Sequence, residues 1–257
     1  MGAFHTRSLT VSYGGVRAVD GVTLDVEAGT LTGLIGPNGA GKTSVIDALS
    51  GFVGYEGSVV LDGVALDDLP PHERARRGLV RSFQTVELFD DLDVQGNLLV
   101  AADGLTVWGA FRDLVAPRRV SSGGRLDRAV EVVGIGDLLG RGTGELSEGE
   151  RKLVGLCRAL VAGPSVLLLD EPAAGLDTAE SRRLGERLRA IVETGITVLL
   201  VDHDMDLVLN VCDLVHVIDG GRHIASGTPD EVRRHERVAA AYLGVEATDA
   251  ARGGVRV

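Results

Sequence analysis

A glycine-rich stretch at residues 36–44, Gly-Pro-Asn-Gly-Ala-Gly-Lys-Thr-Ser, constrains the fold of this chain more than any other feature. It follows a short apolar run at 31–35 and precedes residues 45–49, whose apolar positions have helical spacing. The pattern G-x-x-x-x-G-K-[ST] has a physical meaning only in this order of strand, loop and helix. A glycine-rich turn with a solvated lysine is the alternative, but the flanking segments favour a phosphate-binding loop.

A loop of this kind binds phosphate mainly through its backbone. Glycines let successive N–H groups point inward at phosphate oxygens, and the following helix adds the positive end of its dipole. We expect Lys42 to reach the β- and γ-phosphates and the Thr43 hydroxyl to ligate Mg²⁺. The residues predicted to hold the triphosphate are Gly36, Asn38, Gly39, Ala40, Gly41, Lys42, Thr43 and Ser44.

Composition limits the classes of partner. The chain has 257 residues, a formal net charge of −11 and a pI of about 5.0. An acidic chain gains little from the phosphate backbone of nucleic acid, so we expect no nucleic-acid partner. Its basic clusters at 74–77, 118–119 and 182–183 are short and flanked by acids. We interpret all three as solvated helix faces.

The cysteines and the apolar runs bear on the compartment. The only two cysteines, Cys157 and Cys212, lie in apolar contexts without metal-ligand spacing, which indicates reduced core thiols and a cytosolic location. The amino terminus lacks the apolar segment of a secretion signal. No run approaches the roughly eighteen apolar residues of a membrane span. We therefore expect that any work at a membrane is done through a partner.

Periodicity predicts an α/β chain with a helical insertion. Alternating or apolar runs predict strands at 4–13, 19–26 and 31–35, whereas the chain is helix-like from 94 to 162. Continuous apolar runs return at 165–169 and 196–201 around an amphipathic helix, which is typical of a βαβ unit in a buried parallel sheet. A last helix is predicted over 229–243.

These elements fit one domain of 257 residues. We assign its core to residues 1–83 and 164–244 and a helical subdomain to residues 84–163. Residues 245–257 have the composition of a frayed tail.

A pair of acids, Asp170 and Glu171, ends the buried apolar run at 165–169. An aspartate at the carboxyl end of such a strand is where a phosphate-loop fold holds Mg²⁺. Glu171, one residue later, is placed to polarise an attacking water as a general base. Two acids capping a strand would be unremarkable alone, but an upstream phosphate loop favours the catalytic interpretation.

Further motifs complete an ordered set around these two sites. They are Gln84 after a strand, Leu-Ser-Glu-Gly-Glu at 146–150, Ala-Gly-Leu-Asp at 174–177, and His203 after the strand at 196–201. In this order the chain resembles an ABC-type ATPase over nearly its whole length. The resemblance implies an α/β fold: a P-loop NTPase ABC-type core, with an amino-terminal antiparallel β subdomain and an inserted α-helical subdomain. It also implies ATP and Mg²⁺ as cofactors.

The resemblance assigns a role to each motif. Ser147 and the backbone at Gly149 would donate hydrogen bonds to the γ-phosphate of an ATP held by a second subunit. Gln84 would sense Mg²⁺ and water and tie the helical subdomain to the nucleotide. His203 would contact the γ-phosphate, and Asp177 would link the two active sites across the dimer.

Alternative interpretations exist for Tyr13 and for the signature motif. Tyr13 matches the aromatic residue that stacks on adenine, with an ordinary strand aromatic as the alternative. The signature of the family usually reads Leu-Ser-Gly-Gly-Gln, whereas Glu148 and Glu150 occupy its third and fifth places here. Glu150 puts a carboxylate near a helix start that should face phosphate. It either weakens binding to the partner's ATP or points away.

The sequence around His203, the Gly-Thr-Pro at 227–229 and the segment 241–244 are similar to one subgroup, the ATPase subunits of high-affinity branched-chain amino acid importers. The resemblance implies an Mg²⁺-dependent ATPase at the cytoplasmic face of the cell membrane, gripping permease subunits through residues 87–93. A second ATPase subunit would pair with it, in a heterodimer or a homodimer, and an extracytoplasmic substrate-binding protein would supply the solute.

Two alternatives remain open from sequence. Urea and short-amide importers share most of these features. A non-transport single-cassette ABC ATPase, such as an Fe–S assembly factor, has the same architecture.

Overall fold

The computed structural model describes residues 3–82, 87–102 and 124–242. Its main layer is a six-stranded sheet, parallel except for one antiparallel edge strand. In spatial order the strands are β11 (Arg222–Gly227), β10 (Leu214–Asp219), β4 (Leu31–Ile35), β9 (Thr197–Val201), β8 (Val166–Asp170) and β7 (Leu79–Ser82). A five-stranded antiparallel assembly lies beside it: β2 (Val16–Val22), β1 (Phe4–Tyr13), β5 (Glu56–Leu61) and β6 (Val64–Ala65), with β3 (Asp25–Val26) on β1.

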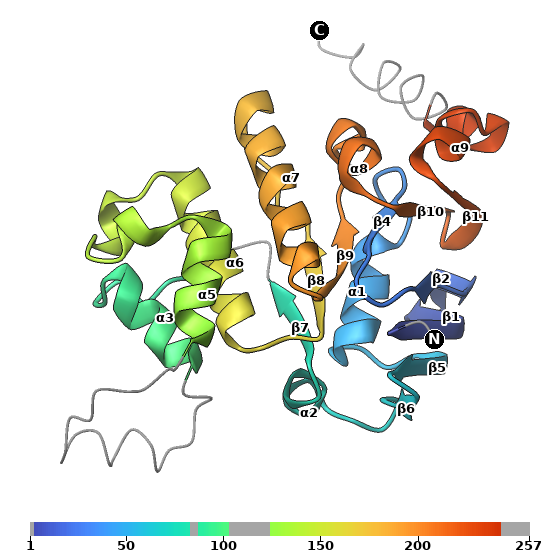
Figure 1. Cartoon of the computed structure of the whole chain (residues 1–257). Coiled ribbons are helices and arrows are strands. Elements are labelled where there is room, and N and C mark those ends of the chain that lie inside the picture. The colour runs from blue at the N-terminus through green and yellow to red at the C-terminus, as the bar shows by residue number, and fades with distance from the viewer. Residues whose placement is uncertain (1–2, 83–86, 103–123, 243–257) are drawn as a thin grey trace, which may run out of the picture.

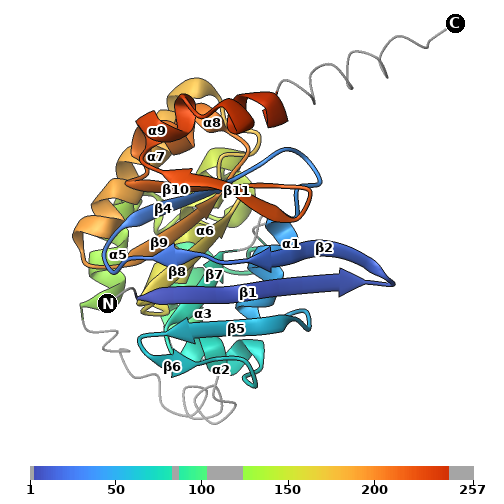
Figure 2. The ribbon, with the colours of Figure 1, turned by 90° about the vertical axis from the view of Figure 1, so that its right-hand side faces the viewer.

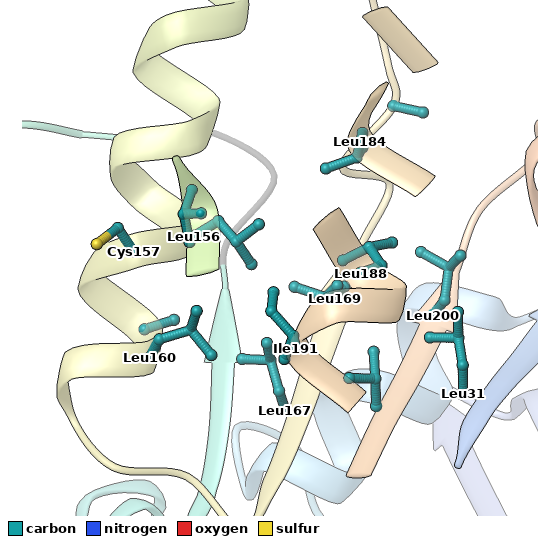
Figure 3. Packing of buried hydrophobic residues seen from close by; sticks show 14 of the residues in the cluster. Leu31, Leu156, Cys157, Leu160, Leu167, Leu169, Leu184, Leu188, Ile191 and Leu200 are labelled. Carbon is teal, nitrogen blue, oxygen red and sulfur yellow. The ribbon is translucent and has the colours of Figure 1, made fainter. Parts of the chain in front are cut away.

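The central strands β4, β8 and β9 are buried on both faces, which explains their mostly apolar sequences. Leu167 and Leu169 of β8 point to one face, where they meet Leu188 and Ile191 (Figure 3). Leu168, between them, packs into the other cluster. Strand β8 therefore contributes to two cores at once, and this packing fixes the position of its carboxyl end at Asp170.

Helices cover both faces of the six-stranded sheet (Figures 1 and 2). Helix α1 (Lys42–Ser50) packs Val45, Ile46 and Leu49 into the core that it shares with the antiparallel strands. Helices α7 (Thr178–Glu193), α8 (Met205–Val211) and α9 (Pro229–Arg233) lie on the opposite face. Leu184, Leu188 and Ile191 of α7 form the buried stripe that the sequence predicts.

A group of helices stands to one side of the sheet (Figure 1). It contains α3 (Val94–Ala102), α5 (Arg125–Val133) and α6 (Glu148–Val161), with short 3-10 turns at Gly136–Leu138 and Thr143–Glu145. Helix α6 packs on α3, α5 and β7, so this group is attached directly to the sheet edge. The predicted boundaries of a helical subdomain at 84 and 163 remain predictions, and the predicted tail at 245–257 lies outside the described residues. No described helix is long and apolar enough to cross a membrane.

The predicted strand at 19–26 is wrong as a single element. The structure has β2 and β3 instead, both paired with β1 but separated by Thr23 and Leu24. The cause lies in β1, where Ser8 has a left-handed φ of 49° and interrupts the ladder. The Ser8 N–H then donates to the Thr23 hydroxyl at 3.1 Å, so the partner strand breaks opposite the bend.

The prediction of solvated helix faces is wrong for Arg74. This residue belongs to α2 (Pro71–Arg76), and its side chain is buried. Its guanidinium donates to the carbonyls of Ala48 and Leu49 at 2.9 Å each, and it caps the carboxyl end of α1. The carbonyls at a helix end lack intrahelical partners, so a buried cation is well placed there.

The last predicted helix, over 229–243, is also shorter than expected. Helix α9 ends at Arg233, because the chain turns at Arg234, and helix resumes at 236–242. Both cysteines are free and buried, as predicted, and burial raises the pKa of each thiol to about 12.

Candidate active site

The carboxyl ends of three neighbouring parallel strands bring the predicted residues together. Strand β4 leads into the glycine loop, β8 ends at Asp170, and β9 leads into Asp202 and His203. The strands are adjacent in the order β4, β9, β8, with Asp170 opposite Val201 and Leu34 also opposite Val201. Ligands of open α/β sheets bind at this edge. The candidate site therefore follows from topology as well as from motif.

The glycine loop is shaped by close backbone approaches. A Cβ at Gly36 would lie 2.2 Å from the carbonyl oxygen of Ile218, and one at Gly41 would lie 2.3 Å from that of Ala18. Gly41 also has a φ of 101° and is the N-cap of α1. Side chains at either position would force the loop away from β10 or β2. These glycines fix the path that starts helix α1 at Lys42.

Lys42 is buried and folds back over the loop. Its Nζ donates to the carbonyl oxygens of Gly36 at 2.7 Å and Pro37 at 3.2 Å. Burial lowers the pKa of Lys42, whereas the nearby carboxylates of Glu171, Asp202 and Asp170 act in the opposite direction. The lysine therefore brings a poorly solvated positive charge to the mouth of the loop, which is what a phosphate requires.

Glu171 adopts an unusual backbone conformation. Its φ is 47°, in the left-handed region that non-glycine residues rarely enter, and its N–H donates to Val201 O at 2.7 Å. Such strain costs about 1–3 kcal/mol and clusters at functional sites. The bend turns the glutamate away from the line of β8. Its Oε2 lies 3.7 Å from Nδ1 of His203, so the two predicted catalytic residues are adjacent.

Asp202, to which the sequence motifs assign no role, holds together the turns that follow β8 and β9. It is fully buried, and its Oδ1 accepts hydrogen bonds from the N–H groups of His203 at 2.8 Å and Asp204 at 3.0 Å. Its Oδ2 accepts from the N–H of Ala173 at 3.1 Å, just beyond Glu171. One buried carboxylate thus links the turns after β8 and β9. A charged residue directly after a continuous apolar strand was the available signal.

Arg81 is a second residue that the motifs did not identify. It lies in β7, and its guanidinium contacts Asp170 Oδ2 at 2.7 Å and Asp47 Oδ1 at 2.6 Å. An arginine that directly follows two apolar residues of a strand was the available signal in the sequence.

The signature motif at 146–150 and the motif at 174–177 each lie at the start of a helix, and both form capping boxes. In α6 the Ser147 side chain accepts from Glu150 N, while Glu150 Oε2 accepts from Ser147 N at 2.7 Å. In α7 Asp177 and Glu180 exchange the same two bonds. Gly149 lies next to Glu180, because an added Cβ would be 3.0 Å from Glu180 Oε1. The predicted contacts of Ser147, Gly149 and Asp177 across a dimer remain predictions.

The donor chemistry at the site suits Mg²⁺. Thr43 is exposed in the first turn of α1, and Asp170 ends β8 with a buried carboxylate. Mg²⁺ is commonly held by one or two protein oxygens, with phosphate oxygens and water completing its shell. A hydroxyl and one carboxylate therefore fit the ion in the presence of a nucleotide. No group of three or more metal-binding side chains occurs among the described residues.

Two predicted residues are placed differently from the rest. Gln84 lies outside the described residues. Tyr13 ends β1 and is 46% exposed. The neighbouring strand β2 reaches the phosphate loop through Gly221, whose N–H donates to Ala40 O at 3.0 Å and whose carbonyl accepts from Asp20 N at 2.8 Å. The stacking of Tyr13 on adenine remains a prediction.

Comparison with known proteins identifies the family. A family model described as "ABC transporter" matches residues 19–174, from β2 through the glycine loop to the turn after Asp170 and Glu171. The chain belongs to the ABC transporter family. A second model, described as "Branched-chain amino acid ATP-binding cassette transporter", matches residues 222–248.

Relatives of this ABC protein match over nearly its full length. It is 39% identical over 252 residues to the high-affinity branched-chain amino acid transport ATP-binding protein BraF of Pseudomonas aeruginosa, covering 92% of this chain and 95% of the relative. It is 38% identical over 246 residues to LivG of Escherichia coli K12, a protein of the same description, with the same coverage. Similarity extends to LptB of E. coli K12, a lipopolysaccharide export ATP-binding protein, at 36% identity, 95% of this chain and 98% of LptB.

Solved structures agree with the ABC cassette fold. The ADP conformation of MJ1267, an ATP-binding cassette of an ABC transporter, superposes with a TM-score of 0.84 at 30% identity and covers 95% of this chain and 99% of that one. A nucleotide-free cassette from an ABC transporter gives a TM-score of 0.82 at 30% identity, covering 94% and 99%. The family and its relatives support an ATPase coupled to transport.

Proposed function

We propose that this protein is the ATP-binding and hydrolysing subunit of an ABC importer for branched-chain amino acids. Lys42 and Asp170 would hold the two sides of the Mg²⁺–triphosphate. Glu171 would accept the proton of the attacking water, a role worth typically about 10²–10⁴-fold in rate. The contact between His203 and Glu171 supports a histidine that keeps the base oriented toward the γ-phosphate.

Within this proposal each side chain has a defined task. Lys42 would exchange its bonds to the carbonyls of Gly36 and Pro37 for phosphate oxygens, and the loop backbone is already in place for this exchange. Thr43 and Asp170 would ligate Mg²⁺, which when bound supplies neutralisation of charge on the β- and γ-phosphates. Asp202 keeps the turns of Glu171 and His203 together.

The site is half of a composite one in this account. Ser147 and Gly149 of a partner ATPase subunit would cover the γ-phosphate, and the same residues of this chain would serve the partner's ATP. The partner is a second ATPase subunit, in a heterodimer or homodimer. ATP then acts as a ligand of the closed dimer, and the work available is limited by its differential affinity for closed over open.

Permease subunits would dock beside the site, at the cytoplasmic face of the membrane. Phe89 and Leu92 are 48% and 37% exposed, and Phe52 is 53% exposed. Phe89 and Leu92 lie next to each other, with Leu92 N donating to Phe89 O at 3.1 Å, and adjacent exposed apolar side chains suit a protein contact surface. Arg158 of α6 stacks on Phe89 at 5.3 Å and donates to Glu87 O at 2.7 Å, so a movement of α6 would be transmitted to this surface.

The observation that carries the substrate class is the match at residues 222–248. The cassette match at 19–174 does not distinguish one transported substrate from another. LptB, which is named for export, is nearly as similar to this chain as BraF and LivG. The model matched at 222–248 is described by branched-chain amino acids. It begins at the first residue of β11 and includes α9.

Affinity purification of the tagged chain from detergent-solubilised membranes tests this function. We expect co-purification of two permease proteins and a second ATPase subunit, because the proposed transport cycle requires the ABC subunit to be bound to them. The Lys42→Ala variant should assemble in the same complex without holding ATP, so it is the matched control for the ATPase activity of the purified complex. Recovery of soluble assembly proteins without permeases would favour the non-transport alternative and contradict the proposal.

A further inference from the structure

Arg81 occupies an unusual position for an arginine. It is the third residue of β7, at the edge of the six-stranded sheet, and its side chain is only 10% exposed. One guanidinium nitrogen contacts Asp170 Oδ2 at 2.7 Å, and another contacts Asp47 Oδ1 at 2.6 Å. Both distances are those of strong charge-assisted hydrogen bonds. The residue therefore bridges a strand end and a helix across the interior of the site.

The bridge connects the two elements that carry the predicted Mg²⁺ groups. Asp47 lies four residues after Thr43 in α1, so the two side chains share one face of the helix. Asp170 is the last residue of β8. Arg81 thus links the helix face that bears Thr43 to the strand end that bears Asp170.

The bridge contains one guanidinium and two carboxylates, so Asp170 keeps the negative charge that a cation site requires. Asp47 contributes a second carboxylate, so the guanidinium does not simply add a positive charge beside a cation site. Arg81 contacts Asp170 through Oδ2, at 2.7 Å. A planar fork can hold two carboxylates in fixed directions, whereas a single ammonium cannot.

The surroundings of the bridge strengthen it. The side chain of Asp170 is 4% exposed, and the ring of Phe52 lies over the Arg81 guanidinium at 5.9 Å. An aromatic ring in this position attracts the cation and keeps water from that side. Electrostatic contacts shielded from water are worth more than exposed ones.

We propose that Arg81 is a positioning residue for magnesium: it fixes the Asp170 carboxylate and its distance from Thr43, with Asp47 as the second anchor. The inference rests on the proposed function, because it takes Asp170 and Thr43 as the groups that meet Mg²⁺. Partners that orient metal ligands are typically worth about 10–100-fold in metal affinity or activity.

Nucleotide binding by the full chain tests this role without relying on turnover. The affinity for a fluorescent ATP analogue is measured in EDTA and at increasing Mg²⁺, for the wild type and for Arg81→Gln. We expect the variant to bind the metal-free analogue like the wild type, since the phosphate loop is untouched. The tightening caused by Mg²⁺ should fall by about tenfold or more. Asp47→Asn should reduce it in the same direction, and Arg81→Lys should restore part of it.

The matched control is Arg189→Gln, which removes an ion pair of the same length, 2.7 Å to Asp213, from an exposed position. It should leave the Mg²⁺ dependence unchanged. A folded Arg81→Gln protein with the tightening of the wild type would overturn the proposal. If Arg81→Gln fails to fold, Asp47→Asn and Arg81→Lys decide in the same assay. A wild type that binds no nucleotide would instead overturn the proposed function itself.

Discussion

Glu150 stands where the signature of the family usually carries an amide, and its contacts explain how a carboxylate is accommodated. The side chain turns back onto the N–H of Ser147 and also pairs with Arg141 at 2.7 Å. The bond from the Ser147 backbone, aided by Arg141, lowers the pKa of Glu150. The carboxylate is thus engaged at its own helix start. Of the two possibilities that the sequence left open, this geometry favours a side chain that points away from a partner's phosphate.

Glu150→Gln should therefore leave ATPase activity the same or higher. Glutamine can fill the same capping position, so helix α6 keeps its start. The partly exposed pair with Arg141 is lost, which is worth less than about 1 kcal/mol, and the bond from the Ser147 N–H becomes one to a neutral acceptor. Steady-state ATP hydrolysis by the assembled complex, with thermal unfolding as the control for stability, checks this. A large loss of activity would mean that the signature is wrongly assigned to residues 146–150.

Site residues that belong to a motif of adjacent residues were predictable, whereas residues that act through contacts with distant parts of the sequence were not. The phosphate loop is encoded by adjacent glycines and a lysine, and Asp170 with Glu171 by a contiguous apolar run. Arg81 meets Asp170 across 89 positions of sequence. Arg74 likewise reaches the end of α1, and nothing in its neighbours distinguishes it from a solvated arginine.

At the scale of elements, a pair of histidines joins the edge of the six-stranded sheet to the antiparallel strands. His216 of β10 lies 3.1 Å from His223 of β11 through Nδ1 and Nε2, and its own Nε2 lies 3.2 Å from Asp25 O in β3. A carbonyl only accepts, so Nε2 of His216 donates and its Nδ1 accepts from His223. Burial lowers the pKa of both residues, with the neighbouring imidazole adding to the effect at His216.

This pair predicts a stability that falls as the pH is lowered. The unfolded imidazoles take up protons near pH 6.5, whereas the folded ones stay neutral to lower pH, so the unfolded state binds more protons in that window. Each such proton contributes a slope of up to about 1.4 kcal/mol per pH unit. Urea unfolding at pH 7.5, 6.5 and 5.5 measures it.

The double variant His216→Gln/His223→Gln is the control for the four other histidines and for the carboxylates. It should show a shallower loss of the free energy of unfolding between pH 6.5 and 5.5 than the wild type. Equal slopes would show that the pair does not titrate differently in the folded state.

Element order was predictable because β8 and β9 follow nearly continuous apolar runs on either side of an amphipathic helix, a pattern typical of a sheet covered on both faces. Their meeting at one edge follows from parallel pairing. The break between β2 and β3 was not predictable, because it depends on a left-handed Ser8 in the opposite strand. Local propensity carries no information about such a partner.

At the scale of the whole molecule, the proposed mechanism assigns the phosphate loop and the signature helix of one subunit to two different composite sites. Lys42 and Glu171 lie at the edge of the six-stranded sheet, whereas Ser147 begins a helix of the group beside it. Under this proposal the subunit would need a partner ATPase for turnover and a permease for transport. The central claim is therefore that ATP hydrolysis at Glu171 drives solute uptake.

Uptake of labelled leucine, isoleucine and valine by cells whose own gene encodes Glu171→Gln tests this claim most directly. Glutamine keeps the size of the side chain but cannot accept the proton, so hydrolysis should fall by about 10²-fold or more. We expect saturable high-affinity uptake to disappear, with the variant protein present at the normal level. Glu193→Gln, at the exposed end of α7, is the control and should leave uptake unchanged. Undiminished uptake of all three amino acids in the Glu171→Gln cells would contradict the account.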